Sequence, residues 1–419
     1  MLDSGHCDGI MTHQDVLETE GLPNNGGKTN NLEDYHAIIS HCLESYKVIQ
    51  DGIYLDFFYR GKLYEGIKFV FYVAFVKADN EEASKFCGHY GSNTGISCLC
   101  RKCSVPTALS GRSLVNYPPK LEPELRDLVA NNNAEKLREL SQHNFINAFW
   151  GVHFGSHDES GIHGACNFDM LHTILSGVLE KTRTEFFVQV GKDSKTATDL
   201  DAFAKEYGHI LKRQSERDMP KASFTKGIMG GKLMAKEFEG VLLLLALLLR
   251  STKGRHLLLE ARSHHFEDEN TILDWTVLVE TLLGWIQWLK SDEMQLSHVK
   301  QSEWKNRYVM HLLKTVMRRT EGMGMSFPKF HMISHLASDI RAGGVPMLFD
   351  TGSDETGHKH TKANSLLTQK NEETFDAQTN TRLLEYRLLQ LAMEELNGRP
   401  LWDYLDGYAE ERIWIRARN

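Results

Sequence analysis

The chain has 419 residues, with 48 Lys and Arg against 56 Asp and Glu, a formal net charge of −8. This charge excludes a wholly basic nucleic-acid coat, and 41% apolar with 25% charged residues excludes intrinsic disorder or collagen-like repetition as the main state. The length suffices for two or three domains with a buried core. The acidity is concentrated at the start, where residues 1–50 hold eight acids and two bases.

We expect neither a membrane span nor disulfides, and the cysteines favour a metal site instead. The longest apolar run, Val241 to Leu249, is less than half of the roughly 20 residues that cross a bilayer, so no membrane span is expected. The N-terminus has no signal-peptide pattern, so we expect a reducing compartment. There are seven cysteines, an odd count. Four of them crowd together in a short segment, which in a reducing compartment favours metal binding: Cys87, Cys98, Cys100 and Cys103.

The first part of the chain predicts a leader, a helix and strands. Residues 1–32 are polar and rich in Gly and Asn, which is typical of a mobile leader. Residues 33–50 have helical spacing of apolar side chains. Residues 53–79 have a period of two, with R-G-K as a turn, and predict two or three strands. The last, Lys68 to Lys77, is apolar on both faces, so we expect it inside a sheet and ending at Asp79.

The remainder of the chain is expected to be helical. Amphipathic stretches from about residue 121 predict an α-domain of about 200 residues. Helical spacing returns in FDAQTNTRLLEYRLLQLAMEELNG, where Gly398 and Pro400 provide a stop.

Two residue pairs predict a zinc site. Cys100 and Cys103 have the C-x-x-C spacing with which two thiolates bind one tetrahedral Zn²⁺ at about 2.3 Å. A second pair must close the site, and His331 and His335 are the best candidates because an i, i+4 spacing puts both imidazoles on one helical face. The alternatives are a chance His spacing and buried thiols that act only as small hydrophobes.

Two aspartates are candidate metal-binding acids. Asp79 follows an apolar segment, and the end of a rigid strand can hold a carboxylate in place, although a turn Asp would look the same. Asp169 and His172 lie one turn apart at the start of a predicted helix. An N-capping Asp is the simpler explanation there.

A third group lies near the C-terminus. Glu355, His358 and Lys362 are spaced i, i+3, i+7 and would share one helical face, as would the residues of an exposed polar stripe. Carboxylates of Asp79 and Glu355, with Asp169, suit Mg²⁺ or Mn²⁺.

Two such ions about 4 Å apart can activate a water or a 3′-hydroxyl against a phosphodiester. That chemistry requires a nucleic acid. Residues 205–236 and 300–319 each carry a net charge of +5 that could contact its backbone, although charged helical faces are usually only solvated.

The order of these motifs resembles a known family. The strings FVKADNEEASKFCGHYGSNTGISCLCRKCSVP, SQHNFINAFWGVHFG, GIHGACNFDMLH and FPKFHMISHLASDIRAGGVPMLFDTGSDETGHKHTK together resemble eukaryotic cut-and-paste transposases of the CACTA, Plavaka and Kyakuja-Dileera-Zisupton group. The resemblance extends from about Tyr35 to Glu385. A similar order of acid, Cys pair, His pair and Glu occurs in the catalytic subunit of the V(D)J recombinase.

The resemblance implies a fold and a domain organisation. The expected fold is an α/β RNase H-like core, incomplete and interrupted by a large all-α insertion, with one structural zinc site. Residues 1–32 would form an acidic leader, and residues 33–118 part of the core with the Cys pair. Residues 119–322 would form the helical insertion. Residues 323–419 would carry the His pair and Glu355 on helices that complete the core.

The resemblance also implies residue roles. Asp79 corresponds to the second metal-binding Asp and Glu355 to the last acid, while His331 and His335 complete the zinc site. Asp169 and His172 match a D-x-x-H motif that either lines the active site or braces the start of the insertion. His358 and Lys362 would position phosphate.

The implied function is DNA strand cleavage and transfer at transposon ends, with two Mg²⁺ or Mn²⁺ ions, structural Zn²⁺ and a nuclear location. DNA is the expected partner, a homo-oligomer is compatible with this function, and no membrane is involved. Such enzymes need an earlier Asp on the first strand, and no strand-borne Asp stands out in the first 50 residues. The chain is therefore expected to be a fragment or a decayed copy. The alternatives are an inactive remnant that binds DNA or protein through its zinc-stabilised fold, and a zinc hydrolase.

Overall fold

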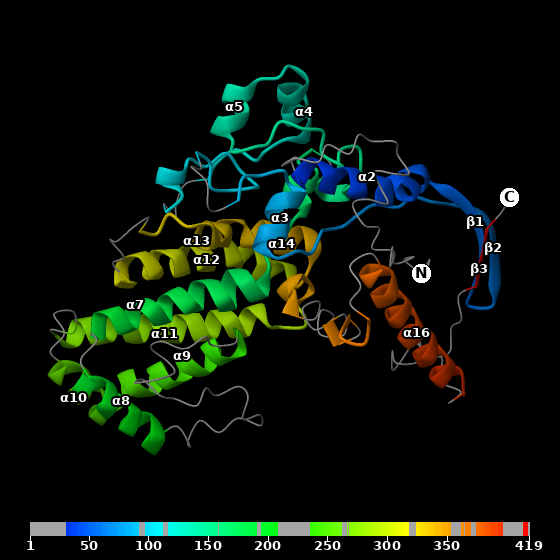
Figure 1. Cartoon of the computed structure of the whole chain (residues 1–419). Helices are drawn as coiled ribbons and strands as arrows, with labels where there is room; N and C mark the ends of the chain where they lie inside the picture. Colours follow the sequence, from blue (N-terminus) through cyan, green and yellow to red (C-terminus); the bar gives the residue numbers. More distant parts are fainter. Residues whose placement is uncertain are drawn as a thin grey trace. The chain divides into compact units, whose positions relative to one another are not determined.

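The computed structural model of the chain (Figure 1) forms two compact units. The first unit comprises residues 1–73, 145–161 and 352–419, and the second comprises residues 74–144 and 162–351. The residues that the structure describes are 31–91, 97–111, 116–157, 159–190, 194–207, 235–261, 266, 268–317, 324–352, 362–363, 365–369, 374–396 and 414–417. The leader predicted for residues 1–32 lies outside these ranges except for its last two residues, and Glu355 and His358 lie outside them too.

The first unit contains a hairpin and two long helices. The helix predicted for residues 33–50 is confirmed as α2 (Asn31–Ile49). Strands β1 (Ile53–Tyr59) and β2 (Lys62–Phe69) pair antiparallel, and β3 (Trp414–Ala417) joins the other edge of β1, in the order β2-β1-β3. The predicted R-G-K turn is confirmed, because Arg60 and Gly61 both have positive φ, 48° and 72°, as a two-residue hairpin turn requires. Helix α16 (Phe375–Leu396) confirms the predicted C-terminal helix.

The strand predicted from Lys68 to Lys77 is wrong beyond Phe69, where β2 ends. Val70 and Tyr72 are exposed, so this segment does not lie inside a sheet. Its backbone donors go to loops instead, as the amide of Val73 donates to the carbonyl of His153 at 2.8 Å. Further along, Val76 forms only an isolated parallel bridge with Cys166. An apolar run with such scattered partners is extended chain rather than a strand of a ladder.

The second unit is helical, as predicted for the long middle of the chain. Its helices in chain order are α3 (Asn80–Phe86), η1 (Thr107–Leu109), α4 (Glu122–Ala130), α5 (Ala134–Glu139), α6 (Ile162–Ala165), η3 (Met170–Leu179), α7 (Glu180–Val190), α8 (Ser194–Tyr207), α9 (Ala235–Arg250), α10 (Thr252–Glu260), α11 (Glu269–Leu289), α12 (Leu296–Met317), α13 (Pro328–Met332), η6 (Ile333–His335), α14 (Leu336–Gly343) and η7 (Pro346–Phe349). Of these, η3 has π-helical geometry.

The core of the second unit lies where α7, α9, α11 and α12 pack side by side (Figure 1). Two buried tryptophans on α11 fix its position through hydrogen bonds. The indole of Trp275 donates to Gln189 on α7 at 2.8 Å, and the indole of Trp285 donates to Asn306 on α12 at 2.9 Å. A buried indole N–H needs such a partner. These bonds therefore make the helix contacts specific as well as apolar.

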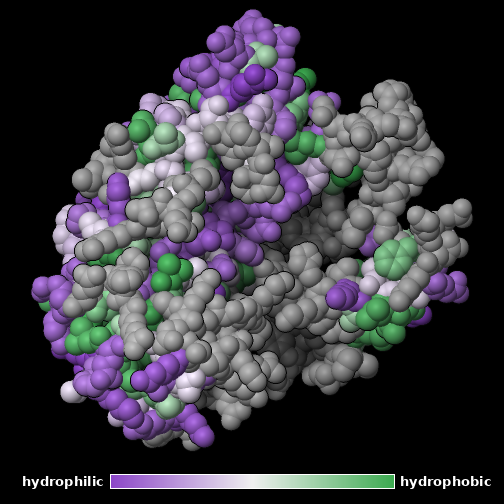
Figure 2. All heavy atoms as spheres, turned by 60° about the vertical axis from the view of Figure 1, so that its left-hand side comes forward, coloured by the Kyte–Doolittle hydropathy of each residue, from purple (hydrophilic) through white to green (hydrophobic). Residues whose placement is uncertain are grey.

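The described chain is thus mostly helical with one small sheet. None of its described helices has both the length and the apolar character needed to cross a membrane. Figure 2 shows a mainly hydrophilic surface over α4 and α5, at the top of the view. An RNase H-like core would need more strands than the three that the described ranges contain, so that part of the expected fold stays a prediction.

Candidate metal centre

Cys100 and Cys103 lie in a buried loop of the second unit. Isolated bridges hold the loop at Cys98, opposite Pro106, and at Cys103, opposite Pro119. The backbone amide of Lys102 points at the Sγ atom of Cys100, 3.3 Å away. An amide directed at sulfur stabilises a thiolate, which is the form that binds metal. The loop therefore presents two sulfur atoms in a metal-binding arrangement.

His331 and His335 come from a helical segment that starts with Pro328. A proline in the first turn suits a helix start because its missing N–H has no helical partner there. His331 lies in α13 and His335 at the end of η6. Buried Phe330 and Ile333 anchor this segment in the core, so the four-residue spacing places both imidazoles on the same side.

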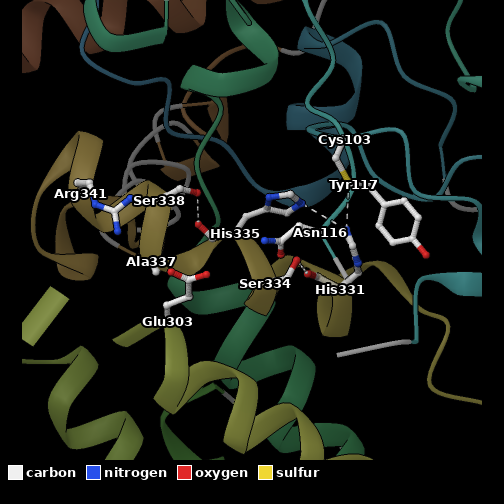
Figure 3. Close-up of a pocket in the computed structure, with 10 residues that line it drawn as sticks. All are labelled: Cys103, Asn116, Tyr117, Glu303, His331, Ser334, His335, Ala337, Ser338 and Arg341. Carbon is white, nitrogen blue, oxygen red and sulfur yellow. Dashed lines mark hydrogen bonds between the residues drawn. The ribbon is translucent and has the colours of Figure 1, made fainter. Parts of the chain in front are cut away.

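The structure brings the two pairs together. Figure 3 shows Cys103 beside His331 and His335, although Cys103 and His331 are 228 residues apart in sequence. The Nε2 atom of His331 lies 3.2 Å from Sγ of Cys103, and Nε2 of His335 lies 3.3 Å from Sγ of Cys100. The two Nε2 atoms are 3.3 Å apart. All four candidate ligand atoms lie within 4.8 Å of one another. Four soft donors thus converge on one point.

This donor set fits zinc. Tetrahedral Zn²⁺ with Zn–S near 2.3 Å and Zn–N near 2.05 Å requires ligand separations of roughly 3.3 to 3.8 Å. The observed separations of 3.2 and 3.3 Å lie at or just below the short end of that range. Two thiolates also balance the charge of a divalent cation. The occupied site would therefore be neutral, and its burial would carry only a small desolvation penalty. Cys100, Cys103, His331 and His335 can therefore bind one zinc ion, and their Cys2His2 composition is that of structural sites.

The two thiols differ in acidity. Burial alone would raise the pKa of Cys100, but hydrogen bonding from Cys103 and the nearby imidazole of His335 hold that pKa well below its ordinary value. The pKa of Cys103 is raised, first by its hydrogen bond with Cys100 and second by burial. The lowered pKa of Cys100 favours its thiolate form, and metal binding would displace the proton of Cys103.

Cys98 supports the loop without belonging to the ligand group. Its buried thiol donates to the carbonyl of Cys103 at 3.1 Å and lies 3.5 Å from the carbonyl of Cys100. The Nε2–H of His89 donates to the carbonyl of Cys98 at 3.0 Å. On the other side of the loop, the Nδ1–H of His163 donates to the carbonyl of Arg101 at 2.8 Å. These bonds fix the backbone that positions both ligand sulfurs.

Lys102 and Asp339 join the two ligand-bearing segments directly. The Nζ atom of Lys102 lies 2.5 Å from Oδ1 of Asp339, and both side chains are buried. The other oxygen of Asp339 accepts from the backbone amide of Phe168 at 3.0 Å. Lys102 stands between the two cysteines, and Asp339 follows His335 by one helical turn. This ion pair therefore holds together the same segments that zinc would connect.

A pocket of about 190 Å³ opens beside the metal-ligand group, by which we mean Cys100, Cys103, His331 and His335. Figure 3 shows that His331 and His335 border it. Its lining residues are Cys103, Asn116, Tyr117, Glu303, His331, Ser334, His335, Ala337, Ser338 and Arg341. A catalytic zinc needs an open coordination position, whereas four protein ligands fill a tetrahedron. The pocket thus borders the ligands without supplying the open position that a zinc hydrolase requires.

Asp79 is a helix N-cap in the structure. Its carboxylate accepts a hydrogen bond from the backbone amide of Glu82 at 2.8 Å, at the start of α3. The neighbouring Asn80 accepts from the guanidinium of Arg101 at 3.3 Å. Arg101 lies between the ligand cysteines, in the loop from Cys98 to Cys103 that we call the zinc loop. Asp79 therefore begins a helix that contacts this loop. Its role as a metal-binding acid stays a prediction.

Asp169 caps η3 and accepts hydrogen bonds at both of its carboxylate oxygens. Its oxygens accept from the backbone amides of Leu171 and His172 at 3.0 Å each and of Thr351 at 3.1 Å. The Nδ1–H of His172 also donates to it. Burial alone would raise the pKa of Asp169, but these bonds outweigh burial and lower it. Asp169 is thus an N-cap, and four donors already occupy its two oxygens.

The remaining predicted residues lie largely outside what can be described. Glu355 and His358 fall outside the described ranges, and Lys362 is exposed. Most of the basic segment 205–236 is also outside them, whereas the other basic segment, 300–319, lies on α12 up to Met317. The roles predicted for Glu355, His358 and Lys362 therefore stay predictions.

Sequence reasoning missed the residues that brace the metal-ligand group. Lys102 could have been noticed because it lies between two ligand cysteines, and Asp339 because it continues the four-residue spacing of the histidines. The sequence placed Cys98 in the cysteine cluster, but no spacing rule predicts its support of the backbone carbonyls in its own loop. His163 has its partner 62 residues away, at the carbonyl of Arg101, and no local pattern points to it.

No family model matches the chain, and no curated protein matches it at a significant level.

Proposed function

We propose that the protein is a transposase-type DNA-binding protein whose helical unit is stabilised by one structural zinc ion. The observation that carries the proposal is the convergence of Cys100, Cys103, His331 and His335. These residues belong to the first and the last of the four motifs whose order gave the resemblance to cut-and-paste transposases. The proposal includes the RNase H-like core that the resemblance implies.

DNA is the proposed partner because of charge as well as resemblance. The outer side of α12 carries exposed Lys300 and Lys314, and its single acid, Glu303, is paired with Arg307 at 3.0 Å. Contacts of Lys and Arg to phosphates give sequence-independent affinity that falls steeply with salt.

A second candidate function is strand cleavage by two-metal phosphodiester chemistry. The observation in its favour is that Asp79 begins α3, whose first residue contacts Arg101 in the zinc loop. The resemblance assigns Asp79 and Glu355 as the carboxylates that would bind Mg²⁺ or Mn²⁺ in this chemistry.

Metal analysis of the full chain tests the zinc site. We expect one zinc per chain, lost in Cys103→Ser and in His335→Asn. Cys42→Ser is the matched control, because Cys42 is an exposed cysteine of the first unit. The proposal is wrong if the variants of the predicted ligands retain stoichiometric zinc.

DNA binding and cleavage are tested separately. Fluorescence anisotropy with duplex and single-stranded oligonucleotides should show binding that weakens with salt. Nicking of supercoiled DNA with Mn²⁺ should be lost in Glu355→Gln and kept in Glu385→Gln, an exposed carboxylate paired with Arg382. Binding without nicking would reject the cleavage function and leave the binding function in place.

A further inference from the structure

The outer face of α12 presents a stacked pair of aromatic rings to solvent. The rings of Trp304 and Tyr308 are nearly parallel, at an interplanar angle of 3°, with centroids 5.6 Å apart. Trp304 is 68% exposed and Tyr308 is 38% exposed. A large exposed aromatic pair on a helix is unusual because such side chains normally bury most of their surface.

The helix does not need this pair for its own packing. The opposite side of α12 is buried through Val309, Met310 and Leu313, which belong to the core of the second unit. The buried tryptophans of α11 are different, because each donates its indole N–H to a side chain. Trp304 and Tyr308 are therefore free to contact a ligand with the faces of their rings.

Basic residues accompany the aromatic pair at a regular interval. Lys300, Arg307 and Lys314 are spaced seven residues apart, which places them on one side of α12 at steps of about 10.5 Å. Arg307 is held by Glu303 and by Asn116. Lys300 and Lys314 form no ion pair with any residue that the structure describes. Of the three positive charges beside the stacked rings, only that of Arg307 is paired with an acid within the described part of the chain.

We propose that this face of α12 binds unpaired nucleotides of single-stranded DNA. Aromatic rings next to Lys and Arg are the combination that binds single strands. The nucleobases stack on the rings, and the phosphates contact the Lys and Arg side chains. A duplex hides the faces of its nucleobases, so the rings select the single strand. The inference rests on the proposed function and names the form of DNA that this surface takes.

The test compares a 20-nucleotide oligo-dT with a duplex of the same length, using the full-length protein and fluorescence anisotropy. Stacking of a nucleobase on an aromatic ring contributes binding free energy, so Trp304→Ala should weaken oligo-dT binding by roughly tenfold or more. Trp304→Phe should recover most of the affinity, and duplex binding should change little. Tyr54→Ala is the matched control, because Tyr54 is an aromatic residue of β1 with 59% exposure.

A second variant tests the charges. Lys300→Gln combined with Lys314→Gln should reduce the slope of log affinity against log salt by about 1.4 for the single strand, from two lost phosphate contacts. Because the replaced side chains are exposed, the melting temperature should not change.

The outcomes separate the inference from the proposed function. Equal oligo-dT affinity of the wild type and Trp304→Ala would overturn the inference while DNA binding persisted. Tighter binding of a uridine RNA of the same length would overturn the assignment to DNA. Failure of the wild type to bind either form of DNA would overturn both the inference and the proposed function.

Discussion

Lys102 and Asp339 form a buried ion pair across 237 residues of sequence, with side chains 7% and 1% exposed. Lys102 also donates to the carbonyl of Gly164 at 3.0 Å, and Asp339 accepts from the amide of Phe168. Each charge is therefore hydrogen-bonded beyond its partner, which is the condition under which a buried pair is tolerated. The pair ties the cysteine loop to the histidine helices independently of any metal.

Asp339→Asn should strongly destabilise the second unit. The substitution leaves the ammonium of Lys102 buried without a counter-charge, and breaking a buried pair in this way costs about 3–5 kcal/mol. Urea unfolding followed by tryptophan fluorescence would measure the loss. Replacing both partners, Lys102→Met with Asp339→Leu, should be much milder because no buried charge is left.

The control for this prediction is the exposed pair of Lys136 and Glu139, 2.6 Å apart. Glu139→Gln should change the free energy of unfolding by less than about 1 kcal/mol, as for surface pairs in general. An effect of Asp339→Asn no larger than that of Glu139→Gln would contradict the role given to the buried pair.

Cys98→Ala should show whether Cys98 is a supporting residue or a metal ligand. The thiol of Cys98 donates to the carbonyl of Cys103 and does not belong to the ligand group. We expect the variant to keep one zinc per chain but to lose roughly tenfold in zinc affinity, as for other outer-shell partners. Competition with a chromophoric chelator would measure the affinity. Loss of all zinc in Cys98→Ala would instead make Cys98 a ligand.

His163 should make stability depend on pH in the acidic range. Burial, and then the positive charge of Lys120, lower its pKa from 6.5 to about 3 in the folded protein. Between these two values the unfolded chain binds a proton that the folded protein excludes, so stability falls as pH decreases from 6.5 towards 3. At pH 5 this contribution is about 2 kcal/mol.

The measurement for this prediction is urea unfolding of the wild type and His163→Gln between pH 7.5 and 5, with zinc buffered at the same free concentration. Glutamine can still donate to the carbonyl of Arg101 but does not titrate. The wild type should lose more stability than the variant as pH decreases. Parallel profiles for the two proteins would show that His163 is not buried in the neutral form.

Asp169→Asn tests the cap of η3, where the folded-state pKa is again lowered and stability again falls as pH decreases. The folded-state pKa of Asp169 lies below its ordinary value of 3.8, so its contribution is present above that pH and disappears as pH falls through the folded-state value. At pH 7 the loss of charge-assisted bonds should cost about 1–3 kcal/mol. The difference from wild type should shrink below about pH 3.8.

The matched control for Asp169→Asn is Asp268→Asn, at the exposed N-cap of α11, where the carboxylate accepts from the amide of Thr271 at 2.8 Å. Asparagine caps helices about as well as aspartate, so this exposed site should be nearly unaffected. A defect of Asp169→Asn that persisted undiminished at pH 3 would show that its charge is unimportant.

Features that depend on near neighbours in the chain could be predicted from the sequence alone. Helical spacing gave α2, the long helices of the second unit and α16, because burial of one helical face leaves a period that is visible locally. It gave the hairpin turn at Arg60 and Gly61 for the same reason. Spacing also identified the two halves of the metal-ligand group, since C-x-x-C and H-x-x-x-H each fix the separation of two donors without help from the rest of the fold.

Features that depend on distant partners could not be predicted in this way and are visible only in the folded chain. The apolar run after Phe69 has the composition of a strand, but its amides pair with scattered loops, and no local pattern encodes such partners. Asp169 could have been a metal ligand until Thr351 and His172 occupied its oxygens. The closing of the ligand group and the pairing of Lys102 with Asp339 were settled in the same way, because a buried charge or thiolate is stable only where the fold brings a complementary group to it.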